Sequence, residues 1–215
     1  MPFFFDSFFI SLQLLFGNQE DRAEYVIGNN RTDWYSAKMI KRNSATVFTC
    51  PVFNIEQMDV EIGCCGFHTF HIIHHPGGAG VLPVHSDGSV TLIRQLRPAV
   101  GAVLLEVPAG RLGAAEDPSQ CAARELLEET GLTASSLIPL GIVYSSPGVF
   151  DEVVHLFAAA GLSAGNAQPE DDEDIEVLRL PFDSVLAMVA DGRISDSKTV
   201  TAITRWHLRM QQGPL

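Results

Sequence analysis

Three glutamates and one arginine crowd a short stretch near the middle of the chain. Arg124 and Glu125 are followed, after two leucines, by Glu128 and Glu129. In a helix, Glu125 and Glu129 lie four residues apart and can converge on one cation, while Arg124 can pair with Glu128. Carboxylate oxygens without nearby thiol or imidazole groups favour Mg²⁺ or Mn²⁺ over zinc. The residue types and their spacing therefore predict divalent-metal chemistry.

The helix that would position these groups has well-defined ends in the sequence. Asp117 can cap it, Pro118 suits its first turn, and Gly131 is a suitable stop. At about 100° per residue, one arc of this helix is apolar and is expected to face the core, whereas the opposite arc carries carboxylates. The apolar arc holds Ala122, Ala123, Leu126, Leu127 and Thr130, and the opposite arc holds Glu125, Glu128 and Glu129. An ordinary solvated helix face is the alternative for any bare pair of glutamates.

The spacing of residues on both sides of these glutamates decides between a metal site and a solvated helix face. Gly110, Glu116 and the run Arg124–Leu132 together resemble the box of the Nudix family at every defined position. The resemblance implies a loop–helix–loop on an αβα sandwich, and an enzyme that hydrolyses a nucleoside diphosphate linked to another moiety. A catalytically dead descendant is expected to have lost a glutamate, and here all of them are present.

The flanking segments are similar to the ADP-ribose pyrophosphatase subfamily. The matching pieces are Arg94–Pro98, Leu105–Gly110, Ser146–Gly148 with Glu152, and Glu173–Val177. This similarity implies Mg²⁺-dependent hydrolysis of ADP-ribose to AMP and ribose 5-phosphate. Hydrolysis of another nucleotide sugar or of a dinucleotide is the alternative within the enzyme class. A non-catalytic nucleotide-sensing module is a further alternative, although it would be expected to carry a damaged box or a basic DNA-binding segment.

The same resemblance implies roles for individual residues. It assigns metals to Glu125, Glu129 and the backbone carbonyl of Ala109, with a further carboxylate from Glu173. Arg97 would hold the diphosphate, since a planar guanidinium suits phosphate oxygens. The general base would be Asp171 or Glu173, with a solvated acidic turn as the alternative for this run of acids. The remaining assignments are Arg124 and Glu128 in the catalytic set, and Arg94, Glu152 and Gly148 in substrate binding.

Two other groups of residues receive structural interpretations. His68, His71, His74 and His75 are interpreted as strand or loop histidines and not as a zinc site, because neighbouring side chains of a strand point to opposite faces. Asp196, Ser197 and Lys198 are interpreted as the capping segment of the last helix alone.

The elements that must position these residues indicate an α+β fold. Several short antiparallel strands are expected between Thr46 and Ile73, ahead of a hairpin of Ala79–Val84 and Val90–Gln95 around the Asp87-Gly88 turn. Further strands are expected at Leu104–Val107 and Val153–Ala158, and helices at Pro118–Thr130, Phe182–Ala190 and Lys198–Met210. The mixed order predicts helices packed on a mixed sheet. The resemblance implies that this is the Nudix αβα sandwich at 76–215, with a small antiparallel sheet within an N-terminal extension at 1–75.

Composition limits the partners. The net charge of −12 disfavours nucleic acid and anionic membranes, and the sequence has no apolar run of membrane-spanning length. Four cysteines without a CxxC pair favour a reducing cytoplasm. The apolar start, Pro2–Phe16, has no basic segment of the kind that a signal peptide requires, so we expect it to pack on the protein or on a second subunit, in a homodimer.

Overall fold

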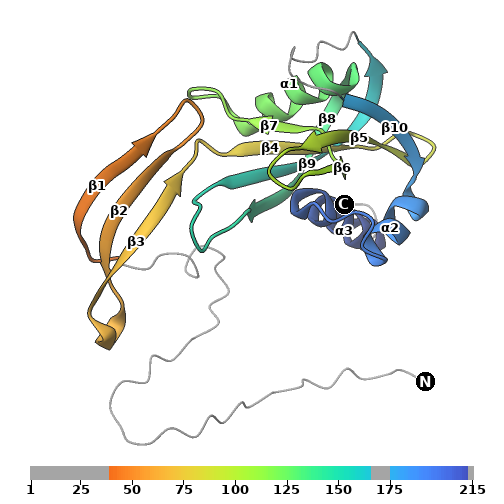
Figure 1. Ribbon diagram of the computed structural model, residues 1–215. Helices are drawn as coiled ribbons and strands as arrows, with labels where there is room; N and C mark the ends of the chain where they lie inside the picture. Colours follow the sequence, from red (N-terminus) through yellow and green to blue (C-terminus); the bar gives the residue numbers. More distant parts are fainter. Residues whose placement is uncertain (1–38, 166–174, 213–215) are drawn as a thin grey trace, which may run out of the picture. The chain divides into compact units, whose positions relative to one another are not determined.

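The computed structural model describes residues 39–165 and 175–212. The described residues belong to one compact unit, Met39–Leu215 (Figure 1). The apolar start Pro2–Phe16 and the acidic residues Asp171 and Glu173 lie outside the described residues, so the expectations placed on them stay predictions.

The first three strands form the small antiparallel sheet that the sequence predicts. They are β1 (Lys41–Thr49), β2 (Asn54–Glu61) and β3 (Phe67–His74), in the order β1-β2-β3, with a short 3-10 turn at Gly63–Cys65 between β2 and β3. Every residue of β1 is exposed. Met58 and Val60 are the buried residues of this sheet.

Two further sheets form the body of the unit. A mixed four-stranded sheet has the order β7-β4-β9-β8, in which β4 runs parallel to β9 and the other pairs are antiparallel. An antiparallel three-stranded sheet has the order β10-β5-β6. The strands are β4 (Gly78–Pro83), β5 (Ser89–Arg97), β6 (Ala102–Glu106), β7 (Ala109–Arg111), β8 (Leu132–Tyr144), β9 (Val153–Ala164) and β10 (Ile175–Pro181).

Three helices cover these sheets, with α1 (Pro118–Thr130) on one side and α2 (Phe182–Ala190) and α3 (Ser197–Gln211) on the other (Figure 1). The predicted bounds of α1 and α2 are confirmed, and α3 extends one residue beyond its prediction at each end. No helix in the described ranges is long and apolar enough to cross a membrane.

Successive side chains of the central strands alternate between two hydrophobic cores, one on each face of the sheet. Val81 of β4 and Phe157 of β9 pack in the cluster that contains α1 residues. Their neighbours Leu82 and Leu156 pack in the cluster that contains α2 and α3 residues. Because successive side chains of a strand point to opposite faces, both faces of this sheet are buried, which confirms the αβα sandwich.

The expected hairpin around Asp87-Gly88 is only partly correct. The turn is present: Gly88 has a φ of 82°, and the amide of His85 donates to the carbonyl of Ser89 at 2.8 Å. However, β4 and β5 belong to different sheets, and the ladder between them is reduced to a single bridge between Val84 and Val90. A tight turn fixes the reversal of the chain but not the strands with which its arms pair.

The end of β3 is tied to the segment that precedes β9. The amide of Ile73 donates to the carbonyl of Val149 at 2.7 Å, and the amide of Asp151 donates to the carbonyl of Ile73 at 3.1 Å. His74 lies between two carboxylates, with Nδ1 2.6 Å from Asp151 and Nε2 2.9 Å from Glu56. These contacts join the N-terminal sheet to the body of the unit.

Candidate active site

Helix α1 begins and ends as its sequence predicts. The Asp117 side chain accepts a hydrogen bond from the amide of Ser119 at 2.8 Å, and Pro118 occupies the first turn. Gly131 adopts a left-handed conformation with φ of 68°, and its amide donates to the carbonyl of Leu127. Such a conformation is readily available to glycine, so the helix stops there and the chain turns into β8.

The predicted division of α1 into an apolar and a carboxylate face is wrong. Glu125 and Glu129 are buried, at 8% and 3% exposure, whereas Ala123 is exposed. The buried arc consists of Cys121, Ala122, Glu125, Leu126 and Glu129. On a helical wheel the two glutamates fall between Cys121 and Leu126, so they share the face that packs on the sheets.

Both buried carboxylates lie against the backbone of β7. A Cβ atom added at Gly110 would lie 1.9 Å from Oε1 of Glu125, so the carboxylate fills the space that any other residue would need. The amide of Ala109 donates to Oε2 of Glu129 at 2.9 Å. The absence of a side chain at Gly110 is thus what lets the helix bring Glu125 onto this strand.

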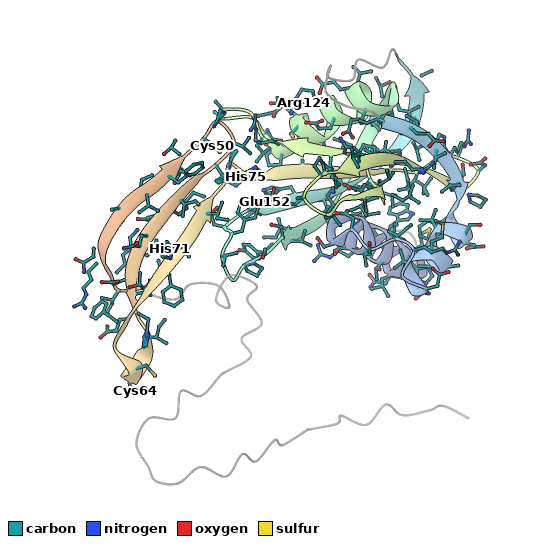
Figure 2. All side chains as sticks on the ribbon, viewed as in Figure 1. Cys50, Cys64, His71, His75, Arg124 and Glu152 are labelled. Carbon is teal, nitrogen blue, oxygen red and sulfur yellow. The ribbon has the colours of Figure 1, made fainter. Side chains whose placement is uncertain are left out.

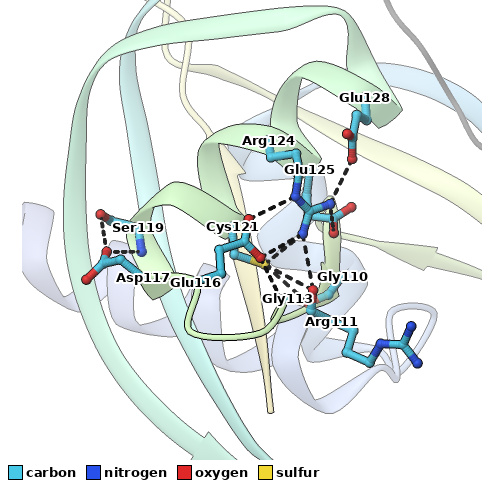
Figure 3. A network of polar contacts seen from close by, with 10 residues as sticks. All are labelled: Gly110, Arg111, Gly113, Glu116, Asp117, Ser119, Cys121, Arg124, Glu125 and Glu128. Carbon is cyan, nitrogen blue, oxygen red and sulfur yellow. Dashed lines mark hydrogen bonds and ion pairs between the residues drawn. The ribbon is translucent and has the colours of Figure 1, made fainter. Parts of the chain in front are cut away.

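Arg124 lies at the centre of the glutamates (Figure 3). Its Nη1 donates to Glu128 at 2.8 Å, as predicted, but also to Glu125 at 2.7 Å, and its Nε donates to Glu116 at 2.9 Å. The hydrogen bonds from Arg124 lower the pKa of Glu116 to about 2. One guanidinium therefore offsets the mutual repulsion of three carboxylates.

The residues present fit a divalent cation. Within the described ranges, no three Asp, Glu, His or Cys side chains gather into a complete metal site. Mg²⁺, however, commonly takes one or two carboxylates and completes its shell with water and substrate phosphates. Glu125 and Glu129 provide such a pair, seated against the Ala109–Gly110 backbone.

Two adjoining cavities open beside this pair. The first, of about 480 Å³, is lined by residues that include Glu116, Arg124, Glu125 and Glu128. The second, of about 320 Å³, is lined by residues that include Arg97, Glu152 and Lys198. The linings share His75, Gly110 and Arg111. The structure thus brings the carboxylates and Arg97 to neighbouring sides of one region.

His75 and Glu152 meet at the edge of the second cavity, with His75 Nδ1 3.3 Å from Glu152 Oε1 (Figure 2). Glu152 is the residue that the resemblance places in substrate binding, and its side chain is 19% exposed. His75 was expected only as a strand or loop histidine. Its position after β3 brings the end of the N-terminal sheet to the cavity.

In the lining of the same cavity, Arg97 shares a buried carboxylate with Lys198. Nε and Nη2 of Arg97 each donate to Glu106 at 2.8 Å, and Nζ of Lys198 also donates to Glu106. Burial acts to raise the pKa of Glu106, but the hydrogen bond from Arg97 and the charge of Lys198 outweigh burial, so the pKa is lowered. Glu106 is therefore an ionised group at 1% exposure.

Two residues expected in substrate binding lie elsewhere. Arg94 is exposed on β5 and pairs with Glu176 of β10 at 2.7 Å, because it stands three residues from Arg97 and so on the opposite face of the strand. Gly148 lines an apolar groove beside Met58 and Val60 of the N-terminal sheet. Their assignments stay predictions.

Sequence alone did not identify Glu106, Arg111 or Lys198, nor the position of His75 at the cavity. The assignment of the Asp196–Lys198 segment to capping alone is incomplete. Asp196 does cap α3, accepting from the amide of Thr199 at 2.9 Å, but Lys198 also reaches Glu106. The available signal was a lysine in the first turn of a helix, where the helix dipole disfavours a cation.

Cys121 is buried beneath the carboxylate network. Its Sγ lies 3.7 Å from the carbonyl oxygen of Gly110 and 3.5 Å from that of Arg111. Burial, together with the charges of Glu125 and Glu116, raises the pKa of this thiol to about 12. At neutral pH the thiol is protonated, and it packs under the site as a small apolar group.

Comparison with known proteins agrees with this geometry. The NUDIX domain model matches residues 74–202. An ADP-ribose pyrophosphatase of Bacillus subtilis is 36% identical over 165 residues, which is 76% of this chain and 89% of that protein. A methanol dehydrogenase activator of Bacillus methanolicus is 33% identical over 83% of this chain and 96% of its own.

Two further similarities concern a nucleotide-sugar enzyme and a solved structure. A GDP-mannose pyrophosphatase of Yersinia enterocolitica is 41% identical over 53% of this chain and 64% of that protein. The crystal structure of an ADP compounds hydrolase superposes with a TM-score of 0.72 at 22% identity, covering 83% of this chain and 98% of that one. The structural similarity supports the fold.

Proposed function

The chain belongs to the NUDIX family, and from this premise we propose that it is a Mg²⁺-dependent hydrolase of ADP-ribose that forms AMP and ribose 5-phosphate. The observation that carries the proposal is the pair of buried carboxylates, Glu125 and Glu129, seated on the Ala109–Gly110 backbone. Two acids on the buried arc of a helix, each held by a polar partner, are not expected of a solvated helix face, so this arrangement favours a catalytic site. The name of the Bacillus subtilis relative supports ADP-ribose as the substrate.

The residues of the site have separate roles in cleavage of the diphosphate. Divalent cations at Glu125 and Glu129, either Mg²⁺ or Mn²⁺, would neutralise the diphosphate and lower the pKa of the attacking water. Arg97, fixed by Glu106, offers its remaining donors to phosphate oxygens. Arg124 holds Glu116, Glu125 and Glu128 in place. The proton acceptor is assigned by resemblance to Asp171 or Glu173.

A second nucleotide sugar is the alternative substrate, and the Yersinia enterocolitica relative is named for GDP-mannose. The Bacillus methanolicus relative is named as an activator of methanol dehydrogenase, and a regulatory role is therefore a further alternative. The complete set of Arg124, Glu125, Glu128 and Glu129 favours the enzyme, because a protein that only senses nucleotide would be expected to have lost a member of this set.

Incubation of the purified protein and Mg²⁺ with ADP-ribose, GDP-mannose and a dinucleotide, followed by chromatography of the products, tests the proposal. We expect AMP and ribose 5-phosphate from ADP-ribose, with the highest kcat/KM of the panel, and no product when EDTA replaces Mg²⁺. Preferential cleavage of GDP-mannose would replace the substrate, and no cleavage of any compound would refute the enzymatic function.

We also propose that the protein is a cytoplasmic homodimer assembled through residues 1–75, ahead of a catalytic domain at 76–215. The support is an apolar groove of about 500 Å³ that lies between Met58, Val60 and Phe70 of the N-terminal sheet and Pro147 and Phe150. Apolar surface of this kind is common at subunit interfaces. Light scattering should give twice the mass of the chain at micromolar concentration, and a monomer would contradict this assembly.

A further inference from the structure

Glu106 is a single carboxylate that serves two cations. It is 1% exposed, and its two oxygens accept from Nε and Nη2 of Arg97 and from Nζ of Lys198. Lys198 also donates to Asp196 at 3.0 Å. The pairing with Glu106 does not use the donors on Nη1 of Arg97, and an ammonium has three donors. Both cations therefore have hydrogen-bonding capacity beyond the buried acid.

The exposure of Arg97 and Lys198 indicates that their remaining donors face the cavity. Neither cation is buried as completely as the acid that pairs with it. The side chain of Arg97 is 36% exposed and that of Lys198 is 15% exposed, and both line the cavity of about 320 Å³. A guanidinium and an ammonium thus face the same space as Ala109 and Gly110, beside the buried carboxylate pair.

The position of Lys198 in α3 also requires a reason other than helix stability. Asp196 already caps the helix through Thr199, and the helix dipole disfavours a cation in the first turn. Thr199 carries the structural link, because its hydroxyl accepts from the amide of Val107 at 2.9 Å while it is itself fully buried. The lysine is therefore separable from the anchoring of the helix.

We propose that Lys198 is a second cation for the substrate diphosphate, held beside Arg97 by the shared carboxylate of Glu106. This rests on the proposed function, in which Arg97 faces the same diphosphate. A diphosphate carries more negative charge than one guanidinium can neutralise. The ammonium of Lys198 is a compact charge and can contact a phosphate oxygen that the planar guanidinium of Arg97 does not reach. Glu106 is a positioning residue that acts through both cations.

The proposal predicts a loss of substrate affinity when the ammonium is removed. Lys198→Met should raise KM about tenfold or more, as expected for loss of one charge-assisted hydrogen bond, with kcat changed far less. Lys198→Arg should recover most of the affinity. Arg193→Met, which removes an exposed cation paired with Asp191, and Thr199→Val, which loosens the same helical turn, should leave KM near the parent value.

A second measurement on the unaltered protein covers the case in which Lys198→Met does not fold. The sequence contains three lysines, Lys38, Lys41 and Lys198, so amine labelling is readily mapped by mass spectrometry. With EDTA present to prevent turnover, ADP-ribose should slow the labelling of Lys198 and leave that of Lys41 unchanged. Lys41 is the internal control because it lies on the exposed strand β1.

The outcomes separate this proposal from the proposed function. If the parent cleaves ADP-ribose but neither KM nor the labelling of Lys198 responds, or if Thr199→Val raises KM equally, Lys198 is only structural and the enzyme assignment stands. If the parent cleaves GDP-mannose and not ADP-ribose, the substrate is wrong, and the same variants test Lys198 with GDP-mannose. A parent that cleaves no diphosphate compound overturns both.

Discussion

The N-terminal sheet and the central strand β4 differ in burial: Met58 and Val60 are the buried residues of the N-terminal sheet, whereas β4 is buried along its whole length. Val47 and Phe48 of β1 are 53% and 50% exposed, whereas Val81 and Leu82 of β4 are fully buried. Both core clusters consist of residues beyond His75. The central sheet is therefore stabilised by core packing within this unit, whereas the N-terminal sheet presents apolar side chains at its surface.

The two regions also differ in how tightly their atoms are packed. In the central region, a carboxylate rests against a glycine backbone, and close packing tolerates no extra atom. At the N-terminal sheet, the groove beside Pro147 and Phe150 is open and apolar. The first region has the fixed geometry that catalysis requires, whereas the second offers an open apolar surface.

The largest expected effect is on catalysis, from a change of one atom in the central region. Glu129→Gln should lower turnover by about a hundredfold or more while the fold persists, because it removes a charged metal ligand and keeps size and helix propensity. Glu61→Gln, on the exposed end of β2, should retain the parent rate. Circular dichroism and a product assay measure both. Near-parent turnover in Glu129→Gln would remove the metal role of that residue.

The next effect is on stability, measured as the free energy of unfolding in urea. Leu156→Ala should cost about 2–5 kcal/mol, because Leu156 is 1% exposed and the truncation leaves a cavity between β9 and α3. Val47→Ala should change stability by no more than about 0.5 kcal/mol, the range for surface substitutions. A larger loss at Val47, growing with protein concentration, would instead mean that a second subunit covers β1.

The smallest effect concerns pH and the link between the two regions. Hydrogen bonds to Asp151 and Glu56 raise the pKa of His74. The stability it contributes is thus fully present below the unfolded pKa of about 6.5 and is lost as pH rises through the higher folded value. Because His74 is a third exposed, the loss should stay below about 1 kcal/mol after screening.

His74→Gln provides the comparison for that measurement. The parent should lose stability relative to His74→Gln as pH is raised from 6 toward 9, and the difference should shrink in high salt, since partly exposed ion pairs are screened. Equal pH dependence of the two proteins would show that the His74 contacts do not contribute to the connection.

Local signals predicted the ends of the catalytic helix well. Asp117, Pro118 and Gly131 act through neighbouring backbone groups, so a short stretch of sequence contains the whole cause. The face of the helix was misjudged because the carboxylate arc, expected to ligate a cation, was placed opposite the core. Glu125 can be buried because β7 approaches closely at Gly110 and because Arg124 pairs with its carboxylate.

The features that the sequence did not predict depend on contacts between residues far apart in the chain. Arg97 and Glu152 reach the predicted cavity, but Glu106 and Lys198 stand 92 residues apart, and nothing local to either predicts their pairing. The separation of β4 from β5 into different sheets has the same origin. The turn between β4 and β5 depends on neighbouring residues, whereas the strands that pair with them, β9 and β10, come later in the chain.

The buried thiol beneath the site has a practical consequence for labelling. With a pKa of about 12 and no exposed surface, Cys121 is a poor nucleophile at neutral pH and should resist alkylation. Cys64 and Cys65 are exposed, and Cys64 lies at the far tip of the N-terminal sheet (Figure 2). A maleimide dye should therefore attach there before it reaches the catalytic region, and its fluorescence would report on association at the sheet while the enzyme keeps working.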